Sequence, residues 1–219
     1  MADATALLRL LTWMSPAFPT GGFAYSHGLE WSVEAGDVTN EAALIGWCKD
    51  MVTHGSLWQD VILLRHAYRA TPEELAALVV LAVALAPSAE RLLESTAQGS
   101  AFALASASWP VPLLANWEDE PLPYPIAVGV LAAGQQIAED DVALAYLHAG
   151  TANFISAAVR LIPLGQMAGL RAQAALEPYC LRAAQLTAHA TLNDIGTASW
   201  AADIASMNHE TQHTRLFRS

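Results

Sequence analysis

Apolar residues recur at helical spacing, three or four positions apart, over most of this chain. Three such stripes stand out in the first 70 residues. They are Leu7, Leu10, Leu11 and Met14, then Leu44, Trp47, Cys48 and Met51, and then Val61, Leu64 and Tyr68. Alternating runs of β-branched residues, which would indicate strands, are scarce. The pattern therefore predicts a helical protein.

Start signals place several of these helices. Asn40 can cap a helix through the second stripe, and Ser88 can cap a later one. Thr71 is followed by Pro72 and Glu74, which is the arrangement of a capping box with proline at the first helical position. These signals predict separate helices joined by short turns.

The middle of the chain is interrupted by prolines. Residues 109–125 hold five prolines and the acidic triplet 118–120, which predicts a loop with turns. Later helices are expected at residues 125–137 and 140–160, from about 165, from about 178, and at 194–207. Residues 1–219 are therefore predicted to form one all-α domain, a bundle of roughly eight to ten helices.

The composition narrows the kinds of partner. The chain is 54% hydrophobic and 14% charged, with a mean hydropathy of +0.31, so one chain has more apolar surface than it easily hides. This favours a protein partner or a homodimer. The net charge is −11 and the only lysine is Lys49, which argues against nucleic-acid binding because phosphate contacts need clustered cations.

Other features indicate a reducing compartment and no membrane. Cys48 and Cys180 lie far apart and form no C-x-x-C pair, so both are expected to be buried free thiols. The apolar run at residues 6–14 is interrupted by Arg9 and makes a poor signal peptide. The most apolar window, residues 75–86, is too short to cross a bilayer. A cytoplasmic protein is predicted.

The sharpest chemical motif is formed by His209, Glu210 and His213, which fit the pattern H-E-x-x-H. On a helix, both histidines could ligate zinc and the glutamate could act as general base. In the extended form of the motif, the required glycine and third histidine would fall on Leu216 and Ser219. A helical metallohydrolase is therefore only the alternative. The preferred interpretation makes the histidines polar residues of a binding segment.

Residues 207–219 end in an unusual way. Arg215 and Arg218 surround Leu216 and Phe217, so two cations flank two apolar side chains. Such a group can dock on a partner, with burial from the apolar pair and directional hydrogen bonds from the arginines. The other option is that Leu216 and Phe217 fold back onto the chain's own core. Partial disorder of this segment is expected before a partner binds.

Residues 15–30 carry two prolines and two glycines directly before a helical pattern, which indicates a shaped entrance to a helix. His27 and Glu30 could form a local pair or line a polar path. The helical spacing predicts that a different set forms a buried stripe: Tyr25, Leu29 and Val33.

Together with the segment Arg-Leu-Ile-Pro-Leu-Gly-Gln at 160–166, the segments 15–30 and 207–219 resemble one protein family. They lie at the start, in the late middle and at the end, so the likeness spans essentially the whole chain. On these motifs the chain resembles UreF, the family of urease accessory proteins that help to load nickel into urease. The resemblance makes 160–166, structurally an interhelical turn, a family landmark and not a catalytic site.

The resemblance implies a non-enzymatic maturation factor. It would bridge UreD and the GTPase UreG and promote GTP-dependent insertion of nickel into apo-urease. The chain itself has no G-x-x-x-x-G-K-[ST] motif and is not expected to be a GTPase. No prosthetic group is implied, nickel would be handled by the complex, and family members can dimerise. A generic helical dimeric adaptor for other partners is the third interpretation.

The resemblance also implies site residues. Tyr25 and Arg215 stand at the positions that the family links to assembly. The predicted partner-binding set is Tyr25, His27, Glu30, Arg215, Leu216, Phe217 and Arg218, and no catalytic or metal-binding residue is predicted.

Overall fold

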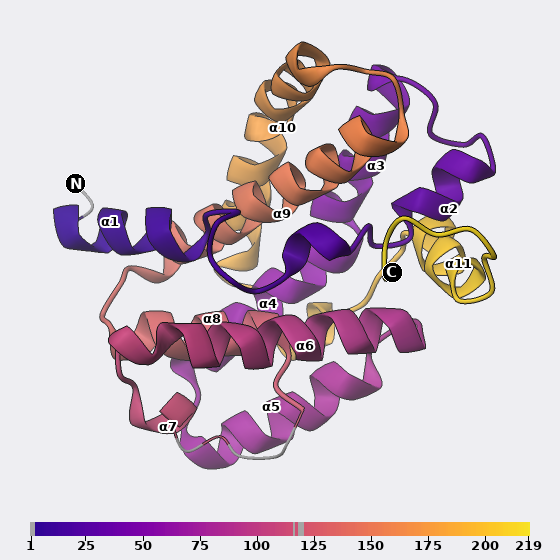
Figure 1. Cartoon of the computed structure of the whole chain (residues 1–219). Helices are drawn as coiled ribbons and strands as arrows, with labels where there is room; N and C mark the ends of the chain where they lie inside the picture. Colours follow the sequence, from indigo (N-terminus) through magenta and orange to yellow (C-terminus); the bar gives the residue numbers. More distant parts are fainter. Residues whose placement is uncertain (1–2, 116, 118–120) are drawn as a thin grey trace.

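The computed structural model describes residues 3–115, 117 and 121–219, and all secondary structure in them is helical (Figure 1). The described residues form eleven α-helices when the single turn α7 is counted, which confirms the predicted all-α single-domain fold. Three short 3₁₀ helices, η1 (Gly22–Ala24), η2 (Ser106–Ser108) and η3 (Leu192–Asp194), join them. The α-helices are α1 (Ala4–Trp13), α2 (Leu29–Glu34), α3 (Glu41–Thr53), α4 (Ser56–Arg69), α5 (Pro72–Ala84), α6 (Ala89–Ala105), α7 (Pro112–Ala115), α8 (Tyr124–Gly134), α9 (Glu139–Leu161), α10 (Gln166–Thr187) and α11 (Trp200–His209).

The predicted helix starts are found where the capping residues stand. The side chain of Asn40 accepts a hydrogen bond from the backbone of Ala43 and begins α3. Thr71 and Glu74 form both bonds of the capping box at α5. The side chain of Ser88 accepts a hydrogen bond from the backbone N–H of Arg91 and begins α6. Each cap satisfies backbone N–H groups that the first helical turn leaves free.

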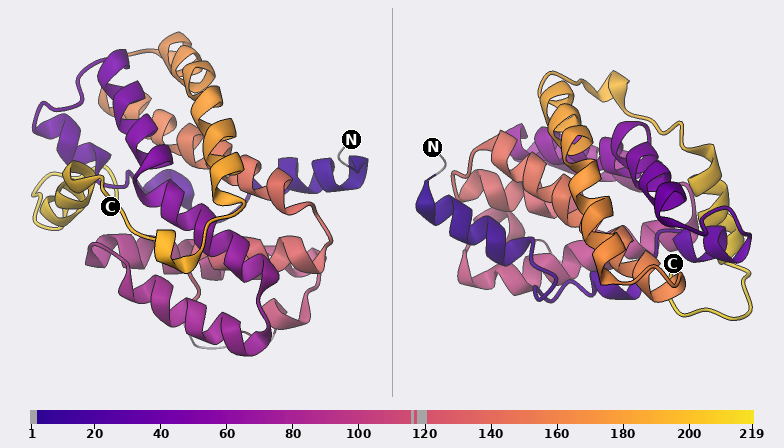
Figure 2. Two further views of the ribbon diagram at one scale, coloured as in Figure 1. Left: turned by 180° about the vertical axis from the view of Figure 1, so that it is seen from behind. Right: turned by 90° about the horizontal axis from the view of Figure 1, so that it is seen from above.

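Helix α8 is the centre of the molecule. All its residues from Pro125 to Ala132 are buried, and it packs between α4 and α6, while α10 lies against α9 and α3 (Figures 1 and 2). Glycines permit this close packing. A Cβ on Gly129 would lie 2.3 Å from the carbonyl oxygen of Leu64, and one on Gly99 would lie 1.8 Å from that of Leu122.

Two predicted boundaries were wrong. Pro178 does not begin a new helix but lies inside α10, on its exposed side, while Leu176 and Cys180 continue the buried face past it. Proline has no N–H to donate to the carbonyl of Ala174, but Ala174 is also exposed, so water can replace that hydrogen bond. The last helix begins at Trp200 and not at Asp194, because Asp194 instead closes a capping box with Thr191 on η3.

The described residues of the proline-rich segment form a loop with turns, as predicted, apart from the single turn of α7 and the start of α8. Its acidic triplet 118–120 lies outside the described residues.

The first apolar stripe, at residues 7–14, predicted the helix correctly but not which of its side chains are buried. Helix α1 forms, but it lies at the edge of the molecule (Figures 1 and 2) and buries Ala6, Leu10 and Trp13. Trp13 packs edge-on against Trp109, with 5.6 Å between ring centroids. The remaining apolar residues of α1 therefore face solvent, namely Leu7, Leu8 and Leu11.

Both cysteines are buried free thiols, as predicted, and burial raises the pKa of Cys48 well above its ordinary value. Among the described residues, α9 is the one helix long and apolar enough to cross a membrane. Half of its most apolar window is buried inside the protein, which is typical of a core helix.

Candidate functional site

The three motifs of the sequence meet at one place in the structure. The guanidinium of Arg160, at the end of α9, donates a hydrogen bond to the carbonyl of Phe23 at 2.7 Å. The same guanidinium lies 4.1 Å from the ring centroid of Phe217. The backbone N–H of Arg218 donates to the carbonyl of Ala24 at 2.8 Å. We call this meeting point of residues 15–30, 160–166 and 207–219 the motif junction.

The C-terminal segment lies against the motif junction with one side inward. Phe217 and Ser219 are only 4% and 1% exposed, whereas Leu216 is 64% exposed and both Arg215 and Arg218 face solvent. The sequence left two alternatives for Leu216 and Phe217, docking on a partner or folding back onto the core, and each side chain follows a different one. Phe217 folds back onto the chain's own core, and Leu216 remains available to a partner.

Hydrogen bonds hold the backbone of this segment, and any disorder before a partner binds would have to break them. The N–H and hydroxyl of Ser26 donate to the main-chain oxygen of Ser219 at 2.6 and 2.5 Å. The hydroxyl of Ser219 donates to Glu94 at 2.7 Å. Tyr25 lies in the chain between Ala24 and Ser26, which both bond to this segment, and it is 4% exposed, so its side chain is buried and not presented to a partner.

Glu30 lies beneath the bend of the C-terminal segment. Its carboxylate accepts hydrogen bonds from the backbone N–H groups of Leu216 at 2.6 Å and Phe217 at 2.9 Å. It is also 3.0 Å from Nε2 of His209. Glu30 is 6% exposed, so these donors replace the water that a carboxylate would otherwise bind.

His209 is shared between two carboxylates. Its Nδ1 lies 2.6 Å from Glu90, which also accepts a hydrogen bond from Arg215 at 2.7 Å. The next residue, Glu210, accepts the N–H of Ala89 at 2.8 Å and so caps the first turn of α6, where a negative charge is favourable.

This arrangement does not fit a zinc site of the H-E-x-x-H type, on which the metallohydrolase alternative depends. Helix α11 ends at His209, so the exposed His213 does not share a helical face with it. Both ring nitrogens of His209 already face carboxylates. In the part of the chain that the structure describes, no group of three His, Cys, Asp or Glu side chains is placed to hold a metal ion.

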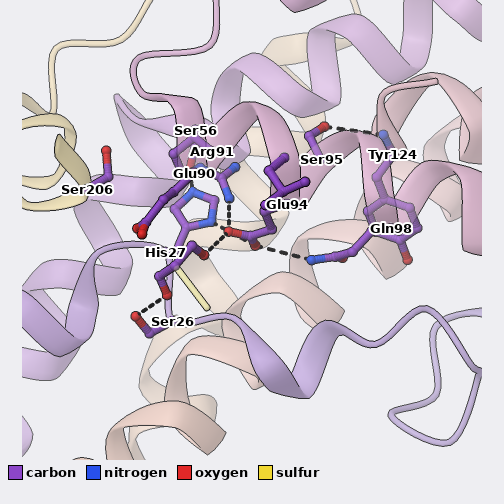
Figure 3. A network of polar contacts seen from close by, with 12 residues as sticks. Ser26, His27, Ser56, Glu90, Arg91, Glu94, Ser95, Gln98, Tyr124 and Ser206 are labelled. Carbon is purple, nitrogen blue, oxygen red and sulfur yellow. Dashed lines mark hydrogen bonds and ion pairs between the residues drawn. The ribbon is translucent and has the colours of Figure 1, made fainter. Parts of the chain in front are cut away.

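His27 and Glu30 do not pair with each other, contrary to the local option in the sequence. His27 has a positive φ of 64°, which turns its ring away towards α4 and α6. Its Nδ1 lies 3.3 Å from Glu94 and its Nε2 lies 2.6 Å from the hydroxyl of Ser56 (Figure 3). Burial, followed by the charge of Arg91, lowers the pKa of His27 to about 4.

Glu94 connects several groups at the back of the motif junction. It forms an ion pair with Arg91 and accepts a hydrogen bond from Gln98 at 3.2 Å (Figure 3). Burial alone would raise the pKa of Glu94, but Arg91 and then His27 outweigh burial and hold it well below its usual range. Glu90 and Glu94 were not among the predicted site residues. Their spacing of four, which puts both carboxylates on one face of α6, was the available signal.

A cavity of about 320 Å³ lies beside this network. Asp60 lines it and accepts a hydrogen bond from the hydroxyl of Tyr146 at 2.9 Å. Burial raises the pKa of Asp60 to about 6, against 3.8 for an ordinary aspartate. The ionised carboxylate is thus disfavoured in the folded state.

Asp60→Asn should therefore stabilise the protein more at pH 8 than at pH 4. The folded pKa lies above the unfolded one, so the native state holds the extra proton between about pH 4 and 6 and stability falls as pH rises through that window. The difference in the effect of the substitution should be at most about 3 kcal/mol. Urea denaturation at both pH values tests this, with the exposed Asp37→Asn as control. An equal effect at both pH values would contradict the assignment.

The amino-acid sequence of this chain is similar to proteins of one known family. A family model described as UreF matches residues 38–177. A urease accessory protein UreF from Bradyrhizobium sp. (strain BTAi1) is 51% identical over 99% of this chain and 93% of its own length. Proteins of the same name from Rhodopseudomonas palustris (strain TIE-1) and Agrobacterium fabrum are 48% and 46% identical. They cover 99% and 100% of this chain and 94% and 98% of their own lengths.

Proposed function

This chain belongs to the UreF family of urease accessory proteins, and we propose that it bridges UreD and the GTPase UreG in urease maturation. In that assembly it would promote GTP-dependent insertion of nickel into apo-urease. The chain acts by binding and has no catalytic role of its own. Nickel is cargo of the assembly, no prosthetic group is needed, and the setting is the cytoplasm.

The observation that carries this proposal is the presentation of the C-terminal segment. Phe217 anchors the segment to the motif junction, and the exposed Leu216 and Arg218 then project from a fixed base. An ordered apolar side chain beside cations suits protein docking, because little conformational freedom is lost when a partner binds.

The apolar surface supports an adaptor rather than an isolated monomer. Large side chains are exposed at separate places on the molecule, among them Leu8 and Leu11 on α1 and Trp200 and Ile204 on α11. A protein that contacts UreD, UreG and apo-urease, or a second copy of itself, needs more than one such surface. This favours a multi-partner role over a single binding site.

Co-purification of the tagged protein with UreD and UreG tests the proposal. Arg215→Ala removes the cation that joins the C-terminal segment to Glu90 and should weaken assembly at least tenfold. Arg182→Ala, an exposed arginine on α10, is the matched control and should leave assembly unchanged. Normal assembly by Arg215→Ala would remove Arg215 from the interface. No assembly by the unaltered protein would refute the adaptor function itself.

A further inference from the structure

The bend of the C-terminal segment is made by one carboxylate. Consecutive N–H groups of an extended chain point in opposite directions. Those of Leu216 and Phe217 instead converge on Glu30, at 2.6 and 2.9 Å. The backbone must therefore turn at these two residues, and this turn places Phe217 inward while Leu216 faces solvent.

Glu30 and the C-terminal segment depend on each other. A buried carboxylate without hydrogen-bond donors is unfavourable, and Glu30 is 6% exposed. If the segment left, water would reach Glu30 and replace these two donors, while His209 would stay in place. The docked state is favoured because two backbone N–H groups make charge-assisted hydrogen bonds to the carboxylate, which exceed the bonds to water that they replace.

His209 fixes the position of Glu30. Its ring is fully buried, and its other nitrogen is held by Glu90 at 2.6 Å. Glu90 comes from α6, and Glu30 comes from α2. The imidazole therefore sets the distance between two helices and the direction in which the carboxylate of Glu30 points.

We propose that Glu30 is the positioning residue of the C-terminal segment and that His209 supports it. Neither side chain touches the partner. Together they set the bend that presents Leu216 and Arg218. This inference rests on the proposed adaptor function and extends it. It gives His209, the first histidine of the H-E-x-x-H motif, and the buried Glu30 a role in shaping the docking surface.

The test compares Glu30→Gln with Glu34→Gln, an exposed glutamate on the same helix. Amide hydrogen exchange of the free full-length protein is the first readout. Glu30→Gln should lower protection at Leu216 and Phe217 at least tenfold and leave the amides of α8 unchanged. Co-purification with UreD and UreG should then fall at least tenfold, and Glu34→Gln should change neither measurement.

Two further variants separate positioning from a general loss of structure. Leu216→Pro removes the N–H that donates to Glu30 and keeps an apolar side chain, whereas Leu216→Ala keeps the N–H. The proline variant, and not the alanine variant, should lower protection at Phe217. In a chain shortened after Thr214, Glu30→Gln should cause no additional loss of assembly, since coupled sites are not additive.

Unchanged protection at Leu216 and Phe217 in Glu30→Gln would overturn the inference, whether or not any partner binds. So would lowered protection together with normal assembly. If the unaltered protein fails to assemble at all, the adaptor function is refuted, while the exchange data still decide whether Glu30 positions the segment.

Discussion

Phe217→Ala should detach the C-terminal segment and reduce co-purification with UreD and UreG about 100-fold. Phe217 is 4% exposed, and its ring lies against the guanidinium of Arg160. Truncating a buried phenylalanine costs about 3–5 kcal/mol, and about 1.4 kcal/mol corresponds to a tenfold change in an equilibrium. The remaining hydrogen bonds of residues 215–219 are too few to offset that loss.

Two comparisons make this result specific. Phe217→Leu retains most of the apolar volume and should recover most of the assembly. Circular dichroism should show the same helix content in both variants, because residues 215–219 lie outside the α-helices. Assembly of Phe217→Ala at the level of the unaltered protein would mean that docking of the segment is irrelevant to partner binding.

Gly99→Ala should destabilise the fold by at least about 3 kcal/mol, at the upper end of the cost of overpacking a core. Its Cβ would lie 1.8 Å from the carbonyl oxygen of Leu122, so the backbone of α6 or of the approach to α8 has to move. For a chain of this length, such a loss lowers the melting temperature by roughly 6–12 °C. Thermal denaturation measures it directly.

Gly46→Ala is the matched control for that substitution. Gly46 is also inside a helix, α3, but a Cβ there would meet nothing within 4 Å. Replacing an exposed helical glycine by alanine stabilises by about 0.5–1 kcal/mol. The two substitutions should therefore have opposite signs. An unchanged melting temperature for Gly99→Ala would contradict the close packing of α6 against Leu122.

Local sequence signals were sufficient for most of the helices. The caps at Asn40, Thr71 and Ser88 act within one turn, so their effect can be predicted without the fold. Pro178 and Asp194 were wrongly predicted to begin helices, because proline and aspartate each occur in more than one structural setting. A proline can sit on the exposed side of a long helix, and an aspartate can cap a 3₁₀ turn instead of an α-helix.

The motif junction could be predicted only in part. The sequence drew attention to Glu30, His209 and Phe217, but it could not show that they touch. Glu30 is 179 residues from His209 and 187 from Phe217 along the chain. No pattern within one helix encodes such contacts. The partners Glu90 and Glu94 were missed because a carboxylate on a helix is usually solvated, and only the packed fold shows that these are buried.

The most direct measurement is the reconstitution of urease activity from purified apo-urease, UreD, UreG, nickel and GTP, with and without this protein. The adaptor account predicts that activity appears only when the protein is present and that Phe217→Ala supports little of it. Equal activation without the protein, or no activation with it, would contradict the account.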